Sequence, residues 1–291
     1  MAVFRKRFIV LSIIIFLVVI FFVLAERSCR SHENIKGSDI RTIAVLMPSI
    51  QEMLCYIGGE DLIVAVSDHS VYPENIRRLP KVAGFKGIDY EALARISPDA
   101  VFSNSVHDND RERLESLGMS YYSFDDKSVK DIKESMLRME RLLGIKDNEE
   151  KILTFSDVFN QKTPENGEDA IVVVGSSDGL KNIYVAGNNN IFSELLKIAG
   201  YKNGYKGNVE YPALGAEDLM RIDPENIFIL DERNNIKKEE KVRMIKEWQK
   251  LDVKAVKRKN IFIINGDNVF IPGPRIIDLL EKIKKKKSED I

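Results

Sequence analysis

The sequence predicts an α/β fold of two similar lobes, because one stretch is repeated and a second is echoed. Residues 91–102 and 217–228 share Glu, Leu, Arg, Ile, Pro, an acid, a β-branched aliphatic residue and Phe in register. A weaker likeness links residues 50–59 with 191–200, each an amphipathic helix pattern that ends in glycine. Repeats so far apart indicate two α/β lobes rather than a solenoid of short units.

Each copy of the main repeat predicts a short helix, a proline stop and a strand. In the first copy, Leu93 and Ile96 lie on one helical face, and Pro98 cannot continue the helix. The second copy follows the same pattern. Each begins with a glutamate, Glu91 or Glu217, near a helix N-terminus, where the helix dipole favours a carboxylate.

Length and composition are compatible with two such lobes. The part beyond about residue 36 is long enough for two units of roughly 100 to 150 residues, and a hydrophobic content of 44% can fill their cores. We expect a signal or membrane anchor with its tether at residues 1–36, an N-terminal lobe at 37–127, a helical linker region at 128–165 and a C-terminal lobe at 166–291.

The N-terminus predicts export and membrane attachment. After a basic flank at residues 5–7, an apolar run interrupted only by Ser12 extends over residues 8–25. At about 1.5 Å per residue this run spans roughly 27 Å, close to a bilayer core of about 30 Å. The basic flank stays cytoplasmic, so we expect everything after Ala25 on the extracytoplasmic face of the cell membrane.

Three fates of this segment stay open: an uncleaved anchor, lipid attachment at Cys29, and cleavage after Ala25. The run is longer than most signal-peptide cores, which favours the anchor. Cys29 directly follows the run, but the residues from Glu26 to Ser28 match a bacterial lipobox poorly. We therefore expect a membrane-anchored protein with residues 26–39 as a polar tether.

Charge and cysteine content argue against several functions. With 44 basic and 45 acidic residues, the net charge of -1 offers no broad basic surface to nucleic acid. Two cysteines are too few for a disulfide framework or a thiolate metal site. Cys55 falls among apolar residues of a predicted helix, so we expect a buried, unreactive thiol.

No catalytic constellation emerges. Residues 175–179 match G-x-S-x-G, the nucleophile elbow of α/β hydrolases, but the residues that follow predict a strand instead of the required helix. The hydrolase order also fails, since His32, His69 and His107 all precede Ser177. The three histidines are too scattered for a metal triad, and no phosphate loop or dinucleotide fingerprint occurs. We therefore predict a binding protein rather than an enzyme.

Aromatic residues in polar loops predict a ligand-binding cleft. Tyr72, Phe85 and Tyr211 lie in segments that contain Gly or Pro and follow predicted strands. Such loops are the part of an α/β sheet that usually meets a ligand. For each ring, the alternative that it only covers the edge of the core stays open.

Short motifs occur in a fixed order along residues 40–285. They are Thr42 to Leu54, Tyr72-Pro73, Leu79 to Gly84, Glu91 to Phe102, Leu114 to Gly118, Glu217 to Ile229, Trp248 to Lys257, Asn260 to Phe262 and Pro272 to Arg275. This ordered set resembles the helical-backbone periplasmic binding proteins that serve ABC importers for cobalamin, ferric siderophores and haem.

The resemblance implies two Rossmann-like lobes joined by a single long helix, with one ligand in the cleft between them. We expect the helix at about Asn148 to Lys162, preceded by a separate helix from Ser128 to Leu143 with a stop at Gly144. One rigid strut leaves few hinge residues, so the binding site should be nearly pre-formed.

The resemblance also implies ligand contacts. In cobalamin-binding relatives, aromatic residues at the positions of Tyr72, Phe85 and Tyr211 contact the corrinoid, and an acid at the position of Asp267 bonds to it. Haem binders of the family use a tyrosine at the position of Tyr72 as iron ligand, and nearby His69 offers a second candidate. A metal ligand is therefore expected only if the ligand is haem.

Siderophore binders more often carry arginines in the cleft, whereas the one matched here, Arg275, begins a helix and has a structural alternative. We rank a corrinoid first, haem second and a ferric chelate third, with no permanently bound cofactor. The partners implied are an ABC permease dimer with its ATPase, since in relatives the glutamates matching Glu91 and Glu217 form salt bridges to permease arginines. Two alternatives remain: both glutamates only favour their helices, or the protein is a membrane-tethered tetrapyrrole or iron-chelate sensor or storage protein without an importer.

Overall fold

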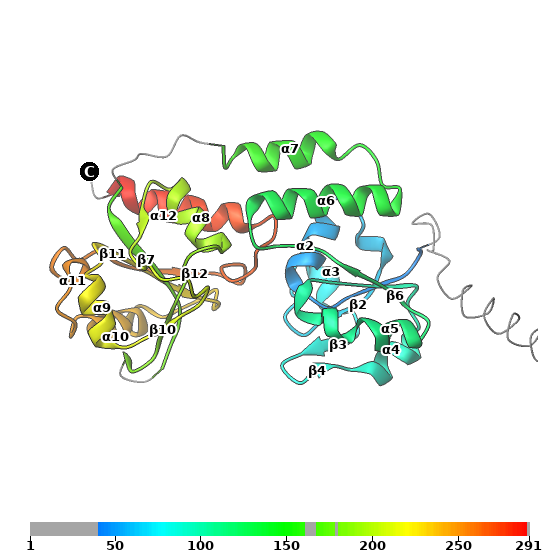
Figure 1. Cartoon of the computed structure of the whole chain (residues 1–291), viewed down its shortest axis with the longest axis horizontal. Coiled ribbons are helices and arrows are strands. Elements are labelled where there is room, and N and C mark those ends of the chain that lie inside the picture. Colours follow the sequence, from blue (N-terminus) through cyan, green and yellow to red (C-terminus); the bar gives the residue numbers. More distant parts are fainter. Residues whose placement is uncertain (1–39, 161–166, 178–179, 290–291) are drawn as a thin grey trace, which may run out of the picture. The chain divides into compact units, whose positions relative to one another are not determined.

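The computed structural model describes residues 40–160, 167–177 and 180–289 (Figure 1). The expected anchor at residues 8–25 and Cys29 lie outside the described residues. Among the described helices, none combines the length and the apolar content needed to cross a bilayer.

The N-terminal lobe is built on a six-stranded sheet with strand order β4-β3-β2-β1-β5-β6. Neighbouring strands are parallel except for the hairpin of β3 and β4. In chain order, the elements are β1 Ile43–Val45, α2 Pro48–Tyr56, η2 Glu60–Leu62, β2 Ile63–Ser67, α3 Glu74–Arg77, β3 Lys81–Gly84, β4 Gly87–Ile88, α4 Tyr90–Ile96, β5 Ala100–Ser103, η3 Ser105–Asp110, α5 Arg111–Ser116 and β6 Ser120–Ser123. The central strands β1 and β5 are fully buried, which is typical of a parallel sheet covered on both faces.

The C-terminal lobe has a second sheet, with strand order β10-β8-β7-β11-β12 and with β9 paired to β7. The strands β7, β11 and β12 are parallel, and β8 runs antiparallel to both of its neighbours. In chain order, the elements are β7 Asp169–Ser176, β8 Ile183–Val185, α8 Ile191–Ile198, β9 Lys202–Asn203, β10 Ala213–Leu214, α9 Ala216–Ile222, β11 Asn226–Asp231, α10 Lys238–Trp248, α11 Lys254–Lys257, β12 Ile261–Asn265 and α12 Ile276–Glu289.

The predicted duplication is confirmed in detail. The helices α4 and α9 each have seven residues and end in a left-handed residue directly before a proline, Ser97 (φ 51°) and Asp223 (φ 48°). Each leads into a central strand, β5 or β11. The weaker echo also holds, since α2 is followed by Gly58 (φ 79°) and α8 by Gly200 (φ 83°), conformations that glycine adopts without strain.

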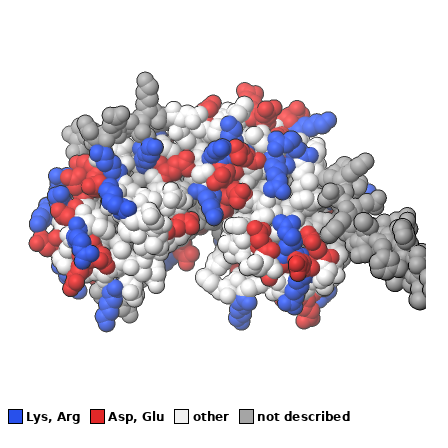
Figure 2. All heavy atoms as spheres, in the orientation of Figure 1, with Lys and Arg blue, Asp and Glu red and all other residues white. Residues whose placement is uncertain are grey.

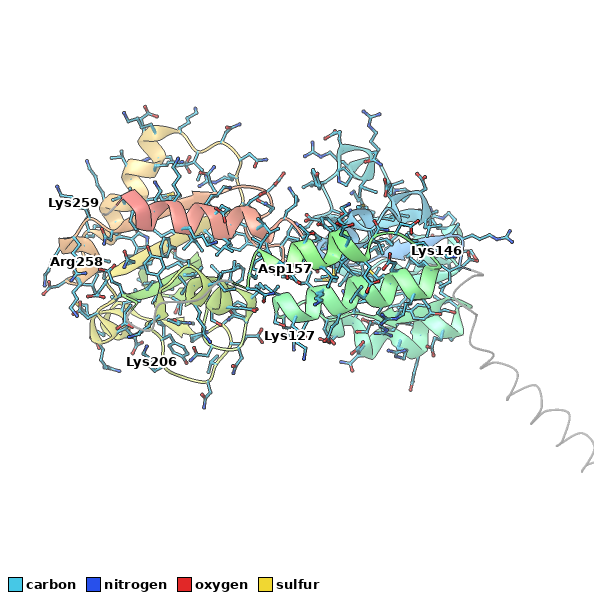
Figure 3. All side chains as sticks on the ribbon, turned by 90° about the horizontal axis from the view of Figure 1, so that it is seen from above. Lys127, Lys146, Asp157, Lys206, Arg258 and Lys259 are labelled. Carbon is cyan, nitrogen blue, oxygen red and sulfur yellow. The ribbon has the colours of Figure 1, made fainter. Side chains whose placement is uncertain are left out.

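Two helices, α6 (Val129–Leu143) and α7 (Glu149–Asp157), follow the first sheet and precede the second along the chain. They lie side by side in space (Figures 1 and 3). The first is as expected: Ser128 Oγ accepts a hydrogen bond from the N–H of Asp131 (3.1 Å), and Gly144 ends the helix in the left-handed region (φ 66°). The second is shorter than the long helix expected at residues 148–162. Its buried face is completed by Phe159 from the turn after the helix, whose ring lies 5.2 Å from that of Phe155.

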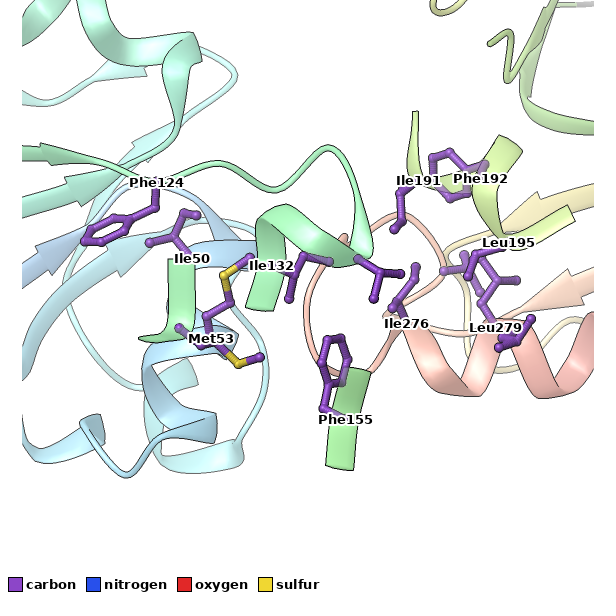
Figure 4. Close-up of a cluster of buried hydrophobic side chains, with 14 of the residues drawn as sticks. Ile50, Met53, Phe124, Ile132, Phe155, Ile191, Phe192, Leu195, Ile276 and Leu279 are labelled. Carbon is purple, nitrogen blue, oxygen red and sulfur yellow. The ribbon is translucent and has the colours of Figure 1, made fainter. Parts of the chain in front are cut away.

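One hydrophobic core extends through both lobes and the two linker helices (Figure 4). Its members include Ile50 and Met53 on α2, Ile132 on α6, Phe155 on α7, Ile191 and Leu195 on α8, and Ile276 and Leu279 on α12. Burying one such side chain contributes about 1.5–3 kcal/mol. The shared core therefore fixes one lobe against the other, which favours a pre-formed cleft.

The thiol of Cys55 on α2 is half-buried and accepts a hydrogen bond from Gln51 Nε2 (3.0 Å). Burial raises the pKa of Cys55 to about 12. Because the thiolate is the reactive form, the raised pKa favours the unreactive thiol that the sequence predicts, although the side chain is half-buried rather than fully buried.

Candidate ligand-binding site

A cavity of about 430 Å³ lies between the two lobes, within the range of roughly 300–1,000 Å³ for small-molecule sites. The N-terminal lobe contributes residues 47–49, 104–106 and 126–127, which follow β1, β5 and β6. The C-terminal lobe contributes residues 190–192, 210–211 and 270–272. Adjacent strands of the first sheet thus present their carboxyl ends to the cavity, the usual place for a ligand in α/β sheets.

Asp126 is the centre of a buried polar cluster on the N-terminal wall. Asp126 is 7% exposed, and its Oδ2 accepts hydrogen bonds from Ser49 Oγ (2.6 Å) and Asn104 Nδ2 (3.2 Å). Burial raises the pKa of Asp126, although both hydrogen bonds act in the opposite direction. Asn104 Oδ1 also accepts from the N–H of Val106 (3.2 Å), which holds the loop after β5 against the cavity.

Tyr211 lines the opposite wall, as predicted. Its ring meets that of Phe192 edge-on, with centroids 6.5 Å apart. Burial raises the pKa of Tyr211 to about 12, with Glu210 and Asp126 adding to the rise. Asn190, the N-cap of α8, donates from Nδ2 to the carbonyl of Glu210 (2.9 Å) and so ties the Tyr211 loop to the helix.

The cavity lining is acidic. Its carboxylates are Asp126 and Glu210, and among the described lining residues Lys127 is the only cation. Lys127 lies at the junction between the lobes (Figure 3). On the visible face, acidic and basic side chains are interspersed and the surface is hollowed between the lobes (Figure 2). The cleft itself therefore suits a ligand without a strongly anionic edge.

Tyr72 and Asp267 are brought together by Arg275. The guanidinium carbon of Arg275 lies 4.1 Å from the centroid of the Tyr72 ring, Nη1 bonds to Asp267 Oδ1 (2.9 Å), and Nη2 bonds to Glu52 Oε1 (2.5 Å). Neither Tyr72 nor Asp267 lines the cavity, although residues 270–272 of the lining immediately precede this cluster. Asp267 thus has an ion-pair partner within the chain, which the sequence did not indicate.

Glu52 makes this cluster a contact between the lobes, since it lies on α2 and Arg275 directly precedes α12. Glu52 is only 4% exposed. Burial raises the pKa of its carboxyl, whereas the hydrogen bond and charge of Arg275 lower it. Arg275 therefore has the structural role that the sequence left open.

His69 and Phe85 contact each other rather than the cavity lining. Their rings are in edge-to-face contact at 4.8 Å, and Phe85, at the turn between β3 and β4, is 96% exposed. Within the described part of the chain, this ring at the tip of a hairpin projects into solvent and is covered by no sheet or helix. Both residues remain predicted ligand contacts.

Glu91 and Glu217 hold equivalent places, each as the second residue of its helix, α4 or α9. The side chain of Glu91 is 89% exposed and pairs with Arg95 (3.1 Å), and Glu217 is also exposed. Neither lines the cavity. Their placement fits a contact with another protein better than one with the ligand.

The rejected catalytic motif has a structural explanation. Ser177 Oγ accepts a hydrogen bond from the N–H of Asn182 (3.1 Å), and the strand β8 that the sequence predicted follows in the described residues. Within the part of the chain that the structure describes, no group of three or more His, Cys, Asp or Glu residues is arranged to hold a metal ion.

Several lining residues were missed by the sequence reasoning, chiefly Ser49, Asn104, Asp126 and Phe192. A usable signal existed for two of them. Asn104 and Asp126 follow strands β5 and β6, which are neighbours in the sheet, and polar residues at adjacent carboxyl ends tend to converge.

Comparison with known proteins adds to this geometry. The profile of a family described as periplasmic binding protein matches residues 43–267. A vitamin B12-binding protein of Vibrio vulnificus (strain YJ016) is 24% identical over 260 residues, covering 86% of this chain and 91% of the relative.

Two solved structures from Vibrio cholerae share the fold. The periplasmic vitamin B12-binding protein superposes with a TM-score of 0.70 at 22% identity, covering 86% of this chain and 98% of that one. The periplasmic haem-binding protein superposes with a TM-score of 0.69 at 16% identity, covering 84% and 98%. One fold therefore accommodates proteins named for different ligands.

Proposed function

Because this chain belongs to the periplasmic binding protein family, we propose that it captures a corrinoid outside the cell membrane and delivers it to an ABC importer. The observation that carries the proposal is the cavity between the lobes, where aromatic rings face a fixed polar cluster. Phe192, Tyr211 and Phe270 offer flat apolar surface, and Asp126 is a buried acceptor held in one orientation. Large rigid rings with a few polar groups suit a broad macrocycle.

The charge of the lining favours a corrinoid over the other chelates. A corrinoid carries carboxamide side chains around its ring, haem carries propionate carboxylates, and ferric siderophore complexes are commonly anionic. The lining has two carboxylates, Asp126 and Glu210, and one cation, Lys127. It therefore repels a ligand whose edge carries carboxylates more than a ligand whose edge carries amides.

Haem is the second candidate, and one observation favours it. The guanidinium of Arg275 lies over the ring of Tyr72 and restricts its orientation, and a tyrosine oxygen is one of the protein ligands known for haem iron. Tyr72 is 48% exposed, so its side chain is accessible to a ligand that approaches from solvent. On this alternative, Tyr72 is the metal ligand and His69 a further candidate.

The proposed partners are an ABC permease dimer and its ATPase, reached from a membrane-anchored position. Glu91 and Glu217 give the two lobes one exposed carboxylate each at equivalent places. Two such charges match a permease built from two equivalent subunits.

Calorimetry with the purified full chain tests the ligand. We expect cyanocobalamin to bind one to one, and Tyr211→Ala to weaken binding by about 1–3 kcal/mol, the range for truncation of an anchoring aromatic ring. Tyr184→Ala is the matched control, because Tyr184 is 46% exposed against 43% for Tyr211 but does not line the cavity.

The opposite result is equally clear. In that case cyanocobalamin gives no heat of binding, while haemin gives a tyrosinate charge-transfer band that disappears in Tyr72→Phe. This result would make haem, and not a corrinoid, the proposed ligand. Heat only with an anionic ferric chelate would contradict both.

A further inference from the structure

The carboxylate of Asp126 is oriented with part of its hydrogen-bonding capacity unused. Ser49 and Asn104 both donate to Oδ2, whereas among the described residues Oδ1 receives only a long hydrogen bond from Asn104 Nδ2 (3.4 Å). A carboxylate can accept about four hydrogen bonds. Since Asp126 lines the cavity, its remaining acceptor positions are available to a ligand there.

The surroundings keep this acceptor in place. Ser49 belongs to the first turn of α2. Asn104 is fixed by two hydrogen bonds: its side-chain Oδ1 accepts from the N–H of Val106, and its backbone carbonyl accepts from Tyr121 Oη (3.1 Å). Asp126 is thus held from two separate elements of the lobe. A group held in this way discriminates between ligands because it cannot turn aside from an unfavourable partner.

We propose that Asp126 is the residue that makes the cavity select ligands with amide N–H groups at their edge over ligands with a carboxylate at the same position. The inference rests on the proposed function and names the chemical feature by which the cleft chooses among chelates. An amide donor satisfies Oδ1, whereas a carboxylate at that place sets two acceptors of like charge against each other. Glu210 on the opposite wall adds to this selection, and Lys127 opposes it.

The test uses two probes that differ by a single group. Cyanocobalamin is compared with its monocarboxylic acids, in which one propionamide is hydrolysed to a carboxylate and the ring is unchanged. Dissociation constants are measured by calorimetry for each acid isomer on the full chain. We expect the wild type to bind the amide at least about tenfold more tightly than one of the isomers, a difference of about 1.4 kcal/mol.

Asp126→Asn should reduce this preference to within about threefold, since a neutral amide both donates and accepts hydrogen bonds. Asp125→Asn is the control, because it makes the same change of charge at the neighbouring position, where the side chain is exposed and outside the lining. The control should keep the full preference. If Asp126→Asn does not fold, the wild-type ratios alone decide.

Equal binding of the amide and of every acid isomer by the wild type would overturn the inference, with the proposed function intact. Tighter binding of an acid would overturn it too and would make Lys127 the selecting group. An undiminished preference in a folded Asp126→Asn variant would also reject it. If neither corrinoid binds, the proposed function itself fails and the inference fails with it.

Discussion

Asp99 and Glu225 have the same task in the two lobes: each carboxylate holds the start of a neighbouring strand. Asp99 Oδ2 accepts hydrogen bonds from the N–H groups of Arg41 and Thr42 (both 2.9 Å), directly before β1. Glu225 Oε2 accepts from the N–H of Asp169 (3.1 Å), the first residue of β7. Both acids follow the proline of the repeat, so the repeated acid is explained by strand pairing.

Asp99→Asn should destabilise the protein at neutral pH by about 1 kcal/mol, because partly exposed hydrogen bonds to a charged group are weakened by solvent. Hydrogen bonds from Arg41 and Thr42 lower the pKa of Asp99. The contribution is therefore fully present above the unfolded pKa of about 3.9 and is lost as the pH falls through the lowered folded pKa.

Urea unfolding of wild type and variant at several pH values measures this difference. It should be largest near neutral pH and shrink progressively below about pH 4. Asp61→Asn, at an exposed position, should show neither effect. A difference between wild type and Asp99→Asn that is unchanged at pH 3 would mean that the charge of Asp99 is irrelevant.

Arg275→Met should destabilise the fold by about 3–5 kcal/mol, because it leaves the buried carboxylate of Glu52 without a cation. The double variant Glu52→Gln with Arg275→Met should recover much of that loss. The penalty of the single variant should also shrink in acid, since protonation of Glu52 removes the buried charge. A double-mutant cycle by chemical denaturation measures both effects.

The exposed pair of Arg95 and Glu91 is the control for this cycle. Arg95→Met should change the free energy of unfolding by at most about 1 kcal/mol, as for surface ion pairs in general. An equally small change for Arg275→Met would show that the contact between the lobes is not a buried ion pair in solution.

Glu91→Arg combined with Glu217→Arg should abolish uptake while leaving the dissociation constant for the ligand unchanged. Neither side chain lines the cavity, and like charges set together at an interface cost several kcal/mol. Each single reversal should be milder. Uptake of labelled ligand by cells and calorimetry on the purified variants provide the two measurements.

Glu134→Arg with Glu239→Arg makes the same change of charge at exposed positions on α6 and α10, and it should not affect uptake. Normal uptake in the Glu91 and Glu217 double reversal, at equal protein level, would remove the docking role. Uptake that does not depend on the protein at all would favour the sensor or storage alternative.

The full chain should remain with the membrane through residues 8–25. Carbonate extraction of membranes with metabolic fatty-acid labelling measures this. Label that disappears in Cys29→Ser would select lipid attachment over the anchor. A soluble exported protein that begins at Glu26 would exclude both forms of attachment.

The fold could be predicted where its signals are local. The proline within each repeat, the glycines after α2, α6 and α8, and Ser128 before α6 all act within a few residues, and the structure has them in their expected roles. The extent of α7 could not be predicted in this way, because its last buried position is filled by Phe159 from a turn.

The site was only partly predictable, because its contacts join distant parts of the chain. Tyr211 could be recognised from a ring in a polar loop. The ion pair of Asp267 with Arg275 could not be predicted. The position of Arg275 depends on its second partner, Glu52, which lies in the other lobe. Asp126 was not among the predicted site residues, because only the order of β5 and β6 in the sheet brings it beside Asn104.

The core shared by the two lobes also affects when, during synthesis, this protein can complete its folding. A chain made from its N-terminus completes β1 early, but the continuous core that contains Ile43 and Val45 also contains Ile276, Leu279 and Ile283 from α12, the last helix. Each lobe also has a smaller core of its own, with Leu93 in the first and Trp248 in the second, but the core that joins the lobes is complete only when synthesis is nearly finished. In a polypeptide that threads through a secretion channel, α12 is the last element to emerge, so the two lobes are fixed against each other only at the end of that passage.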